Sequence, residues 1–310
     1  MLQHLTGSRV DQAAGARHAA RMKDLVGKVA VVTGGASGIG LAMAQRFAAE
    51  KMKLVLLDVE APALAEAAKA LRAGGATVFA RRVDVSNVAE MGAALEEARS
   101  ELGIAHVICN NAGVAGPGGP MWTLSEADWK WTMGVNLWGV IHGVRLLLPA
   151  LLESGEEGHV VNTASMAGVT STPFIAPYTA TKHGVVAISE VLAKELELVG
   201  ANVGVSVLCP GFVKTQIATS MRNRPADVTA AAPAHPAGPG MMQAMHALVA
   251  GGVDPASIAD NVVTAIRERR FYILTHPEMK PAIKHRMDDI LDERAPGIDP
   301  LMRSLFAPKP

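Results

Sequence analysis

From residue 28 onward, short runs of apolar, β-branched residues alternate with longer Ala-rich segments whose apolar residues recur at helical spacing. The short runs predict seven strands, over 29–33, 54–58, 77–80, 106–109, 159–162, 204–208 and 271–274. The longer segments predict helices over 39–50, 61–73, 88–101, 126–153 and 178–199. Ser86 and Ser125 are the expected N-caps of the third and fourth helices. This alternation is typical of an α/β domain with a doubly wound parallel sheet, which binds its ligand across the carboxyl ends of the strands.

Two segments fall outside this alternation. Residues 1–24 lack the apolar core of a secretory signal and are predicted to form a disordered extension, with an organelle presequence or a misassigned start as alternatives. Residues 216–253 are interrupted by Pro and Gly, which favours either a lid over a ligand or a surface insertion. Their last part carries apolar side chains suited to such a lid, Met241, Met242 and Met245. Residues 25–310 are predicted to form a single domain.

The composition narrows the kind of partner. The chain has 29 Lys and Arg residues against 29 Asp and Glu residues, so no net field attracts nucleic acid or an anionic membrane. The longest apolar stretches, such as 144–152, are too short and interrupted to cross a bilayer. Cys109 and Cys209 are expected to be buried free thiols, in agreement with a reducing cytoplasm. The His residues show no metal-ligand spacing, so we expect a small-molecule ligand and no metal.

A glycine-rich turn lies between the first strand and the first helix, in the sequence Thr33-Gly-Gly-Ala-Ser-Gly-Ile-Gly40. Its glycines allow a tight turn and the close approach of a pyrophosphate to the helix N-terminus, which makes this a dinucleotide site of the Rossmann fold. The residues expected to touch the cofactor here are Gly34, Ser37, Gly38, Ile39 and Gly40. Asp58 ends the second strand, where a carboxylate binds ribose hydroxyls and repels a 2′-phosphate. We therefore predict NAD rather than NADP, with an ordinary strand-end turn as the alternative role of Asp58.

Tyr178 and Lys182 are spaced i, i+4 and so share one face of a helix, and Ser165 follows the fifth strand toward the same cleft. A tyrosine acts as a base at neutral pH only if its pKa falls by roughly 3 units, and a nearby ammonium has the strength to lower it. We expect Tyr178 to take the proton of an alcohol, Ser165 to steady the forming carbonyl oxygen, and nicotinamide to accept the hydride.

Residues 27–216 resemble the short-chain dehydrogenase/reductase family, in its short single-domain branch. Besides the residues above, the resemblance rests on Asp84-Val85, Asn110-Asn111-Ala112-Gly113, Asn136, and the run from Pro210 to Thr215. It implies a catalytic role for Asn136, which would hold a proton-relay water. It also implies cofactor contacts by Tyr178, Lys182, Asp84, Val85, Asn110, Ala112, Gly113, Pro210, Gly211, Val213 and Thr215. The family commonly pairs subunits through the helices of Asn136 and Tyr178, which implies a homodimer or homotetramer.

Residues 222–225 and 271–278 resemble a sub-branch that includes benzylic alcohol dehydrogenases of lignin-dimer breakdown. That resemblance implies a bulky aryl secondary alcohol, for which Trp122, Phe174, Phe212 and the Met residues would form the pocket. The sequence therefore predicts a cytoplasmic, NAD-dependent oxidoreductase that exchanges a hydride with a secondary alcohol or ketone. A ketone or 3-oxoacyl reductase and a redox-inactive NAD-binding regulator remain the alternatives.

Overall fold

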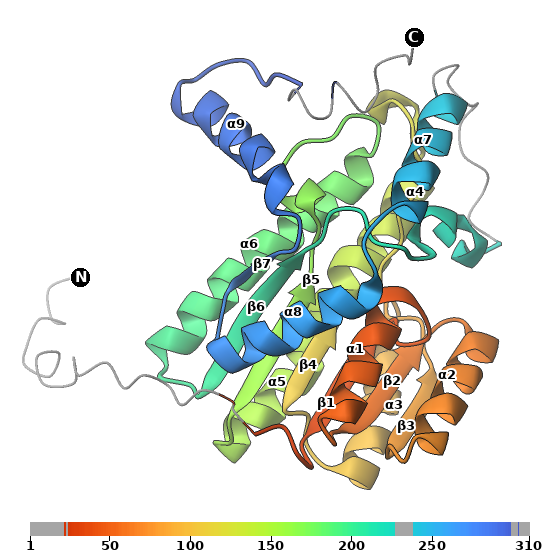
Figure 1. The fold of residues 1–310 in the computed structure, drawn as a ribbon, viewed down its shortest axis with the longest axis vertical. Coiled ribbons are helices and arrows are strands. Elements are labelled where there is room, and N and C mark those ends of the chain that lie inside the picture. Colours follow the sequence, from red (N-terminus) through yellow and green to blue (C-terminus); the bar gives the residue numbers. More distant parts are fainter. Residues whose placement is uncertain (1–21, 23, 227–237, 299–302, 304–310) are drawn as a thin grey trace, which may run out of the picture.

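The computed structural model describes residue 22 and residues 24–226, 238–298 and 303, with side chains from residue 243 onward in the second long range (Figure 1). The expectations for residues 1–21 and 227–237, and for the side chains of Met241 and Met242, lie outside the described part of the chain. Met22 is fully buried in the core, so the predicted extension of 1–24 reaches too far along the chain.

Within the described ranges, seven parallel strands form one sheet in the order β3-β2-β1-β4-β5-β6-β7 (Figure 1). Their bounds are β1 Val29–Thr33, β2 Lys53–Asp58, β3 Val78–Arg82, β4 Val107–Asn110, β5 Gly158–Thr163, β6 Val203–Cys209 and β7 Tyr272–Leu274. The strand order reverses between β1 and β4, which pair directly. The doubly wound sheet predicted from the sequence is confirmed, and its switch point lies where a ligand is expected.

Helices cover both faces of the sheet (Figure 1). On one face pack α1 (Gly38–Ala49), α2 (Ala61–Ala73) and α8 (Pro255–Glu268), around a core that includes Phe47 and Ile258. On the other pack α3 (Val88–Leu102), α5 (Gly139–Ser154) and the end of α6 (Ala176–Leu198), around a core that includes Met91, Leu151 and Leu196. This burial of apolar surface on both faces is what makes the strands read as nearly continuous apolar runs.

The helix predicted over 126–153 is one continuous helical stretch with a local irregularity. It comprises α4 (Glu126–Met133), a π-helical turn at Gly134–Trp138, and α5. The π turn carries Asn136. Among the described helices, this stretch alone is long and apolar enough to span a membrane by length and composition. In this fold it packs on the sheet through buried residues such as Leu148 and Leu151.

Helix ends show one correct and one wrong prediction. Ser125 caps α4 in a capping box with Asp128, as expected. The N-cap of α3 is Asn87 and not Ser86, because the Asn87 side chain accepts from the N–H groups of Ala89 and Glu90 while the Ser86 hydroxyl donates to Asp84. Three helices in the C-terminal part were not predicted, namely α7 (Gly238–Ala250), α8 and α9 (Lys280–Leu291).

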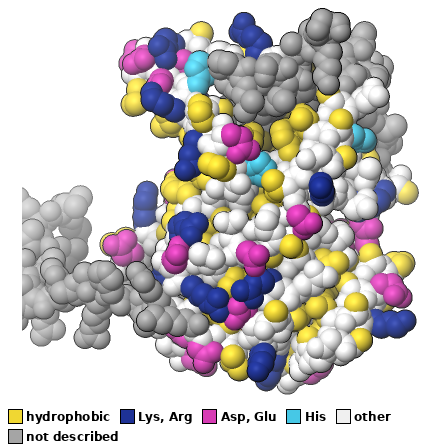
Figure 2. Space-filling model, in the orientation of Figure 1, with side chains coloured by type: hydrophobic (Ala, Val, Ile, Leu, Met, Phe, Trp, Pro, Cys, Tyr) yellow, Lys and Arg dark blue, Asp and Glu magenta, His cyan; other side chains and the backbone are white. Residues whose placement is uncertain are grey.

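The two cysteines are buried and free, as predicted. Cys109 lies one residue before the end of β4 and Cys209 ends β6, and β5 lies between these strands, which keeps the thiols apart. In the part of the chain that the structure describes, no group of three or more His, Cys, Asp or Glu side chains is placed to hold a metal ion. On the face drawn in Figure 2, basic and acidic side chains lie intermixed, in keeping with the balanced charge of the sequence.

Candidate active site

A cavity of about 200 Å³ lies at the carboxyl edge of the sheet. The β1–α1 turn, the ends of β2 to β6, the start of α6 and the 3₁₀ helix η4 (Ile217–Asn223) surround it. It therefore occupies the crevice at which the strand order reverses, as the sheet topology predicts.

The glycine turn forms one wall of this cavity and fits a pyrophosphate. Gly34 and Gly38 have φ values of +65° and +53°, which side chains of L-residues rarely adopt. A Cβ on Gly40 would lie 1.9 Å from the carbonyl oxygen of Gly34, so only glycine lets α1 begin this close to the turn. Ser37, the N-cap of α1, makes no side-chain capping bond, and this leaves the positive end of the helix to an anionic ligand.

Asp58 ends β2 at a second part of the cavity wall. Its Oδ2 accepts a hydrogen bond from the N–H of Ala36 at 2.9 Å, and its Oδ1 accepts one from the N–H of Glu60 at 3.0 Å. Burial raises the pKa of Asp58 above its ordinary value, although these backbone hydrogen bonds oppose the shift. The two bonds fix the carboxylate against the glycine turn, where it can accept hydrogen bonds from ribose hydroxyls.

Ser165, Tyr178 and Lys182 all line the same cavity. Tyr178 and Lys182 lie one turn apart on α6, and the Lys182 Nζ atom is 5.5 Å from the centroid of the Tyr178 ring. The Lys182 ammonium donates to the carbonyl of Thr163 at 2.9 Å. Ser165 follows β5 and hydrogen-bonds to Tyr178. The fold thus brings together the three side chains that the sequence predicts for acid/base chemistry.

The pKa of Tyr178 differs from the sequence-based expectation. Burial raises it above the ordinary value, and the hydrogen bond from Ser165 offsets only part of that rise. Burial also lowers the pKa of Lys182 to about 8. Among the protein's own groups, dehydration of the phenolate therefore outweighs the stabilisation that Ser165 gives it.

Asn136 lies behind the cavity and does not line it. Its side chain is fully buried, accepts from the N–H of Val114 at 2.8 Å and donates to the Val114 carbonyl at 2.9 Å. A Cβ on Gly113 would lie 3.4 Å from Asn136 Oδ1 and 3.5 Å from Lys182 Nζ. Asn136 and Lys182 therefore approach each other across Gly113, at the back of the catalytic residues.

Most of the other predicted cofactor residues line the cavity, namely Asp84, Val85, Ala112, Gly113, Pro210, Gly211, Val213 and Thr215. Asn110 departs from the expectation. Its side chain donates to Asn162 at 2.9 Å, and a Cβ on Gly143 of α5 would lie 1.8 Å from its Oδ1, so it packs between β5 and α5. The next residue, Asn111, lines the cavity instead and bonds to the carbonyl of Thr33.

The wall opposite the glycine turn belongs to residues 216–253, for which the sequence favours either a lid over a ligand or a surface insertion. This wall consists of Gln216, Ile217, Ser220, Arg222 and Asn223, and it faces Glu60 at the other side. Trp131 also lines the cavity. The aromatic residues predicted for the substrate pocket lie outside the cavity lining: Trp122 is 83% exposed, and Phe174 and Phe212 are not among the lining residues. Trp122, Phe174 and Phe212 lie in three separate segments, and the sequence gave no signal for which of these segments would face the cavity.

The comparisons with known proteins agree with this geometry. Residues 28–226 match the sequence model of a family described as short chain dehydrogenase. The chain is 33% identical over 286 residues to a CLA biosynthesis dehydrogenase/reductase of Lactiplantibacillus plantarum, covering 89% of this chain and 98% of that protein. It is 30% identical over 275 residues to a C alpha-dehydrogenase of Sphingobium sp., covering 89% of each. A short chain dehydrogenase/reductase from Burkholderia phymatum, solved in complex with NAD, superposes with a TM-score of 0.87 at 43% identity, over 89% of this chain and 98% of that one.

Proposed function

The chain belongs to the short-chain dehydrogenase family, and from this premise we propose that it oxidises a bulky secondary alcohol with NAD as the hydride acceptor. The observation that carries the proposal is the meeting of Ser165, Tyr178 and Lys182 with the glycine turn around one cavity. An acid/base group and a dinucleotide cradle are the two parts that hydride exchange with an alcohol needs.

The preference for NAD rests on the acidic end of the cavity. Asp58 lies there with its carboxylate fixed by two backbone N–H groups, and Glu60 lines the cavity beside it. A ribose diol can donate hydrogen bonds to Asp58, whereas a 2′-phosphate would meet a carboxylate of like charge. The glycine turn would hold the pyrophosphate, and Asp84 and Val85 would lie against the adenine.

The mechanism assigns one task to each side chain. When bound, the oxidised nicotinamide supplies a hydride acceptor and a positive charge. Tyr178 takes the hydroxyl proton of the alcohol at its Oη, Ser165 donates a hydrogen bond to the oxygen that becomes the carbonyl, and Lys182 holds positive charge beside the phenolate. Asn136 positions the segment behind Lys182 and, with a water molecule, would pass the proton onward. Ketone reduction would use the same residues in reverse.

The substrate is proposed to be a secondary alcohol with a bulky, largely apolar body, such as an aryl carbinol. Trp131, Val114, Ile217 and Val249 contribute apolar surface to the lining of the cavity. The resemblance of residues 222–225 and 271–278 to benzylic alcohol dehydrogenases supports the same class. The buried free thiols fit a reducing cytoplasm, where a largely oxidised NAD pool favours the direction of alcohol oxidation.

A homodimer or homotetramer is proposed to form through α5 and α6. The helical stretch through α5 exposes Trp138, Leu146 and Leu152, and α6 exposes Val191 and Leu198. Apolar side chains gathered on two neighbouring helices are the kind of surface that a second subunit covers. Light scattering of the purified protein at micromolar concentration tests this: a mass of one chain would refute it.

The test of the activity is NADH formation over a panel of aliphatic, alicyclic and benzylic secondary alcohols, by the wild type and by a Tyr178→Phe variant. We expect turnover that is greatest with benzylic alcohols and falls by about 10²–10⁴-fold in the variant, which removes the acid/base group. Turnover only in the ketone-reducing direction would favour a reductase. Tight NADH binding without any turnover would instead favour a redox-inactive regulator.

A further inference from the structure

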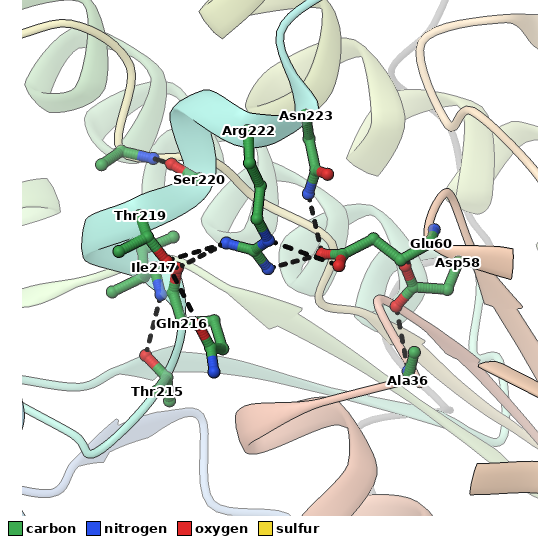
Figure 3. A network of polar contacts seen from close by, with 11 residues as sticks. Ala36, Asp58, Glu60, Thr215, Gln216, Ile217, Thr219, Ser220, Arg222 and Asn223 are labelled. Carbon is green, nitrogen blue, oxygen red and sulfur yellow. Dashed lines mark hydrogen bonds and ion pairs between the residues drawn. The ribbon is translucent and has the colours of Figure 1, made fainter. Parts of the chain in front are cut away.

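Two side chains of η4 reach across the cavity to a single carboxylate (Figure 3). Arg222 Nη2 lies 2.5 Å from Glu60 Oε1, and Arg222 Nε lies 3.3 Å from Glu60 Oε2. Asn223 Nδ2 donates to Glu60 Oε1 at 2.9 Å. Glu60 thus accepts a bidentate pair of hydrogen bonds from the guanidinium and a further hydrogen bond from the Asn223 amide. This arrangement fixes the orientation of the two side chains as well as their distance.

Glu60 belongs to the cofactor side of the cavity. Its own N–H donates to Asp58 Oδ1, the carboxylate proposed to bind the adenosine ribose. Arg222, Asn223 and Glu60 all line the cavity, so their contact joins its two walls at the Asp58 end (Figure 3). The residue that anchors η4 is therefore bonded directly to the residue that would hold the cofactor.

Polar contacts give η4 its shape and its place. Arg222 Nη1 donates to the carbonyl of Gln216 at 3.1 Å and to Thr219 Oγ1 at 3.0 Å, so the guanidinium also gathers the 3₁₀ helix around itself. Ser220 accepts from the N–H of Ala115 on the opposite side. After η4, Arg224 pairs with the buried Asp128. Ser220 and Arg224, which flank Arg222 and Asn223, thus fix η4 to the rest of the fold, and the Glu60 contact joins it to the cofactor side of the cavity.

We propose that Glu60, Arg222 and Asn223 form a latch that closes η4 over the adenosine half of the bound dinucleotide and sets how fast the cofactor leaves. This inference rests on the proposed function. A dinucleotide lying between the glycine turn and η4 can leave at the Asp58 end only after the two walls separate, and the latch is what joins them there.

The Glu60 carboxylate of the latch stays ionised at neutral pH. Burial alone would raise the pKa of Glu60, but the hydrogen bonds from Arg222 and Asn223 outweigh it and lower the pKa below the ordinary value. The Glu60 and Arg222 side chains keep 29% and 34% of their surface exposed. Solvent and salt therefore screen this ion pair, which leaves it weak enough to open during turnover and makes its opening sensitive to ionic strength.

The experiment measures NADH dissociation by stopped-flow fluorescence, with excess NAD as the chase, at low and high salt. The variants are Glu60→Gln, Arg222→Gln and the exchanged pair Glu60→Arg with Arg222→Glu. Glu50→Gln is the matched control, since Glu50 also pairs with two arginines, Arg46 and Arg267, but does not line the cavity. We expect the first two variants to release NADH about fivefold faster at low salt and to lose most of the wild type's salt response.

The exchanged pair should recover part of the slow release, and the Glu50→Gln control should behave as the wild type does. Release at the wild-type rate in both single variants overturns the latch while leaving the proposed function intact. Equal acceleration by the Glu50→Gln control also overturns it, because the effect would then be a general loosening of the fold. A wild-type protein that binds no NADH at all refutes the proposed function itself, and the latch with it.

Discussion

Lys182 shows at the scale of one residue how burial shapes the chemistry of the site. The side chain is 3% exposed, and its ammonium bonds to the Thr163 carbonyl beside the Tyr178 ring. Burial lowers the pKa of Lys182 from 10.5 to about 8. The protein therefore holds a positive charge at neutral pH against a dehydration penalty, in the place where the phenolate of Tyr178 needs it.

This dehydration penalty predicts that replacing Lys182 by an apolar residue changes the free energy of unfolding by an amount that depends on pH. In the unfolded chain Lys182 regains a pKa of 10.5, so between pH 8 and 10.5 the unfolded state binds more protons and stability from this group rises with pH. A Lys182→Met variant should therefore be more stable than the wild type at pH 7, by about 2 kcal/mol once the lost hydrogen bond is counted. The advantage should shrink as pH rises, vanish at about pH 9 to 10, and reverse by about 1 kcal/mol above pH 10.5, where only the lost hydrogen bond remains. Urea unfolding at pH 7 and pH 10 measures it.

The control for this prediction is Lys194→Met, on the same helix but exposed to solvent. Its effect on the free energy of unfolding should be small and the same at both pH values. An advantage of Lys182→Met that stays constant from pH 7 to 10 would contradict the lowered pKa.

Asp58 allows a second test at the residue scale. Replacing its carboxylate by a hydroxyl in Asp58→Ser removes the acceptor for the ribose diol and the charge that would repel a 2′-phosphate. We expect NADH binding to weaken by about tenfold and NADPH binding to strengthen, since a charged hydrogen bond is lost in one case and a like-charge contact in the other. Calorimetric titration with both cofactors measures the change. Tighter binding of NADPH than NADH by the wild type would refute the assigned role of Asp58.

At the scale of elements, the apolar runs predicted the strands well because a strand buried on both faces reads as a continuous apolar run. The amphipathic period also predicted α2 and α6 closely. It could not show the π turn that carries Asn136, because one extra residue within a helix leaves the surrounding pattern almost unchanged. It also missed α8 despite its N-cap Asp254, since the preceding Pro- and Gly-rich run hid the return of helical spacing.

The packing of α5 on the sheet gives a prediction at this scale. A Cβ on Gly143 would lie 1.8 Å from Asn110 Oδ1, so Gly143→Ala must push α5 away from β4 or break the Asn110 to Asn162 bond. We expect a loss of about 1–3 kcal/mol in the free energy of unfolding. The matched change Gly92→Ala in α3 meets only a Leu146 methyl at 3.9 Å and should stabilise by about 0.5–1 kcal/mol. Thermal unfolding of both variants compares them, and equal effects would contradict the close packing.

At the scale of the whole molecule, the site was predictable where its residues follow the strands. Gly34, Asp58, Asp84 and Ser165 stand at or beside strand ends, and a parallel sheet brings such ends to one edge. The contact between the two walls was not predictable, because Glu60 and Arg222 are 162 residues apart and no local pattern links them. The side-chain direction of Asn110 was equally hidden, since it depends on how α5 packs against β4.

The cavity draws its lining from most of the chain, from Gly34 in the first turn to Val249 in α7, so its ligand should stabilise the fold as a whole. A ligand that binds the folded state alone at about 100 times its Kd adds about 2.7 kcal/mol to the free energy of unfolding. For a chain of this size that corresponds to a rise in Tm of about 5 °C. We expect this rise with NADH and a smaller one with NADPH at the same concentration, measured by differential scanning fluorimetry. Because Tyr178→Phe removes a proton-transfer group and leaves the cradle intact, the variant should keep the NADH shift while losing turnover. Equal shifts with both cofactors would contradict the cofactor preference, and loss of the NADH shift in the variant would mean that Tyr178 acts mainly in binding.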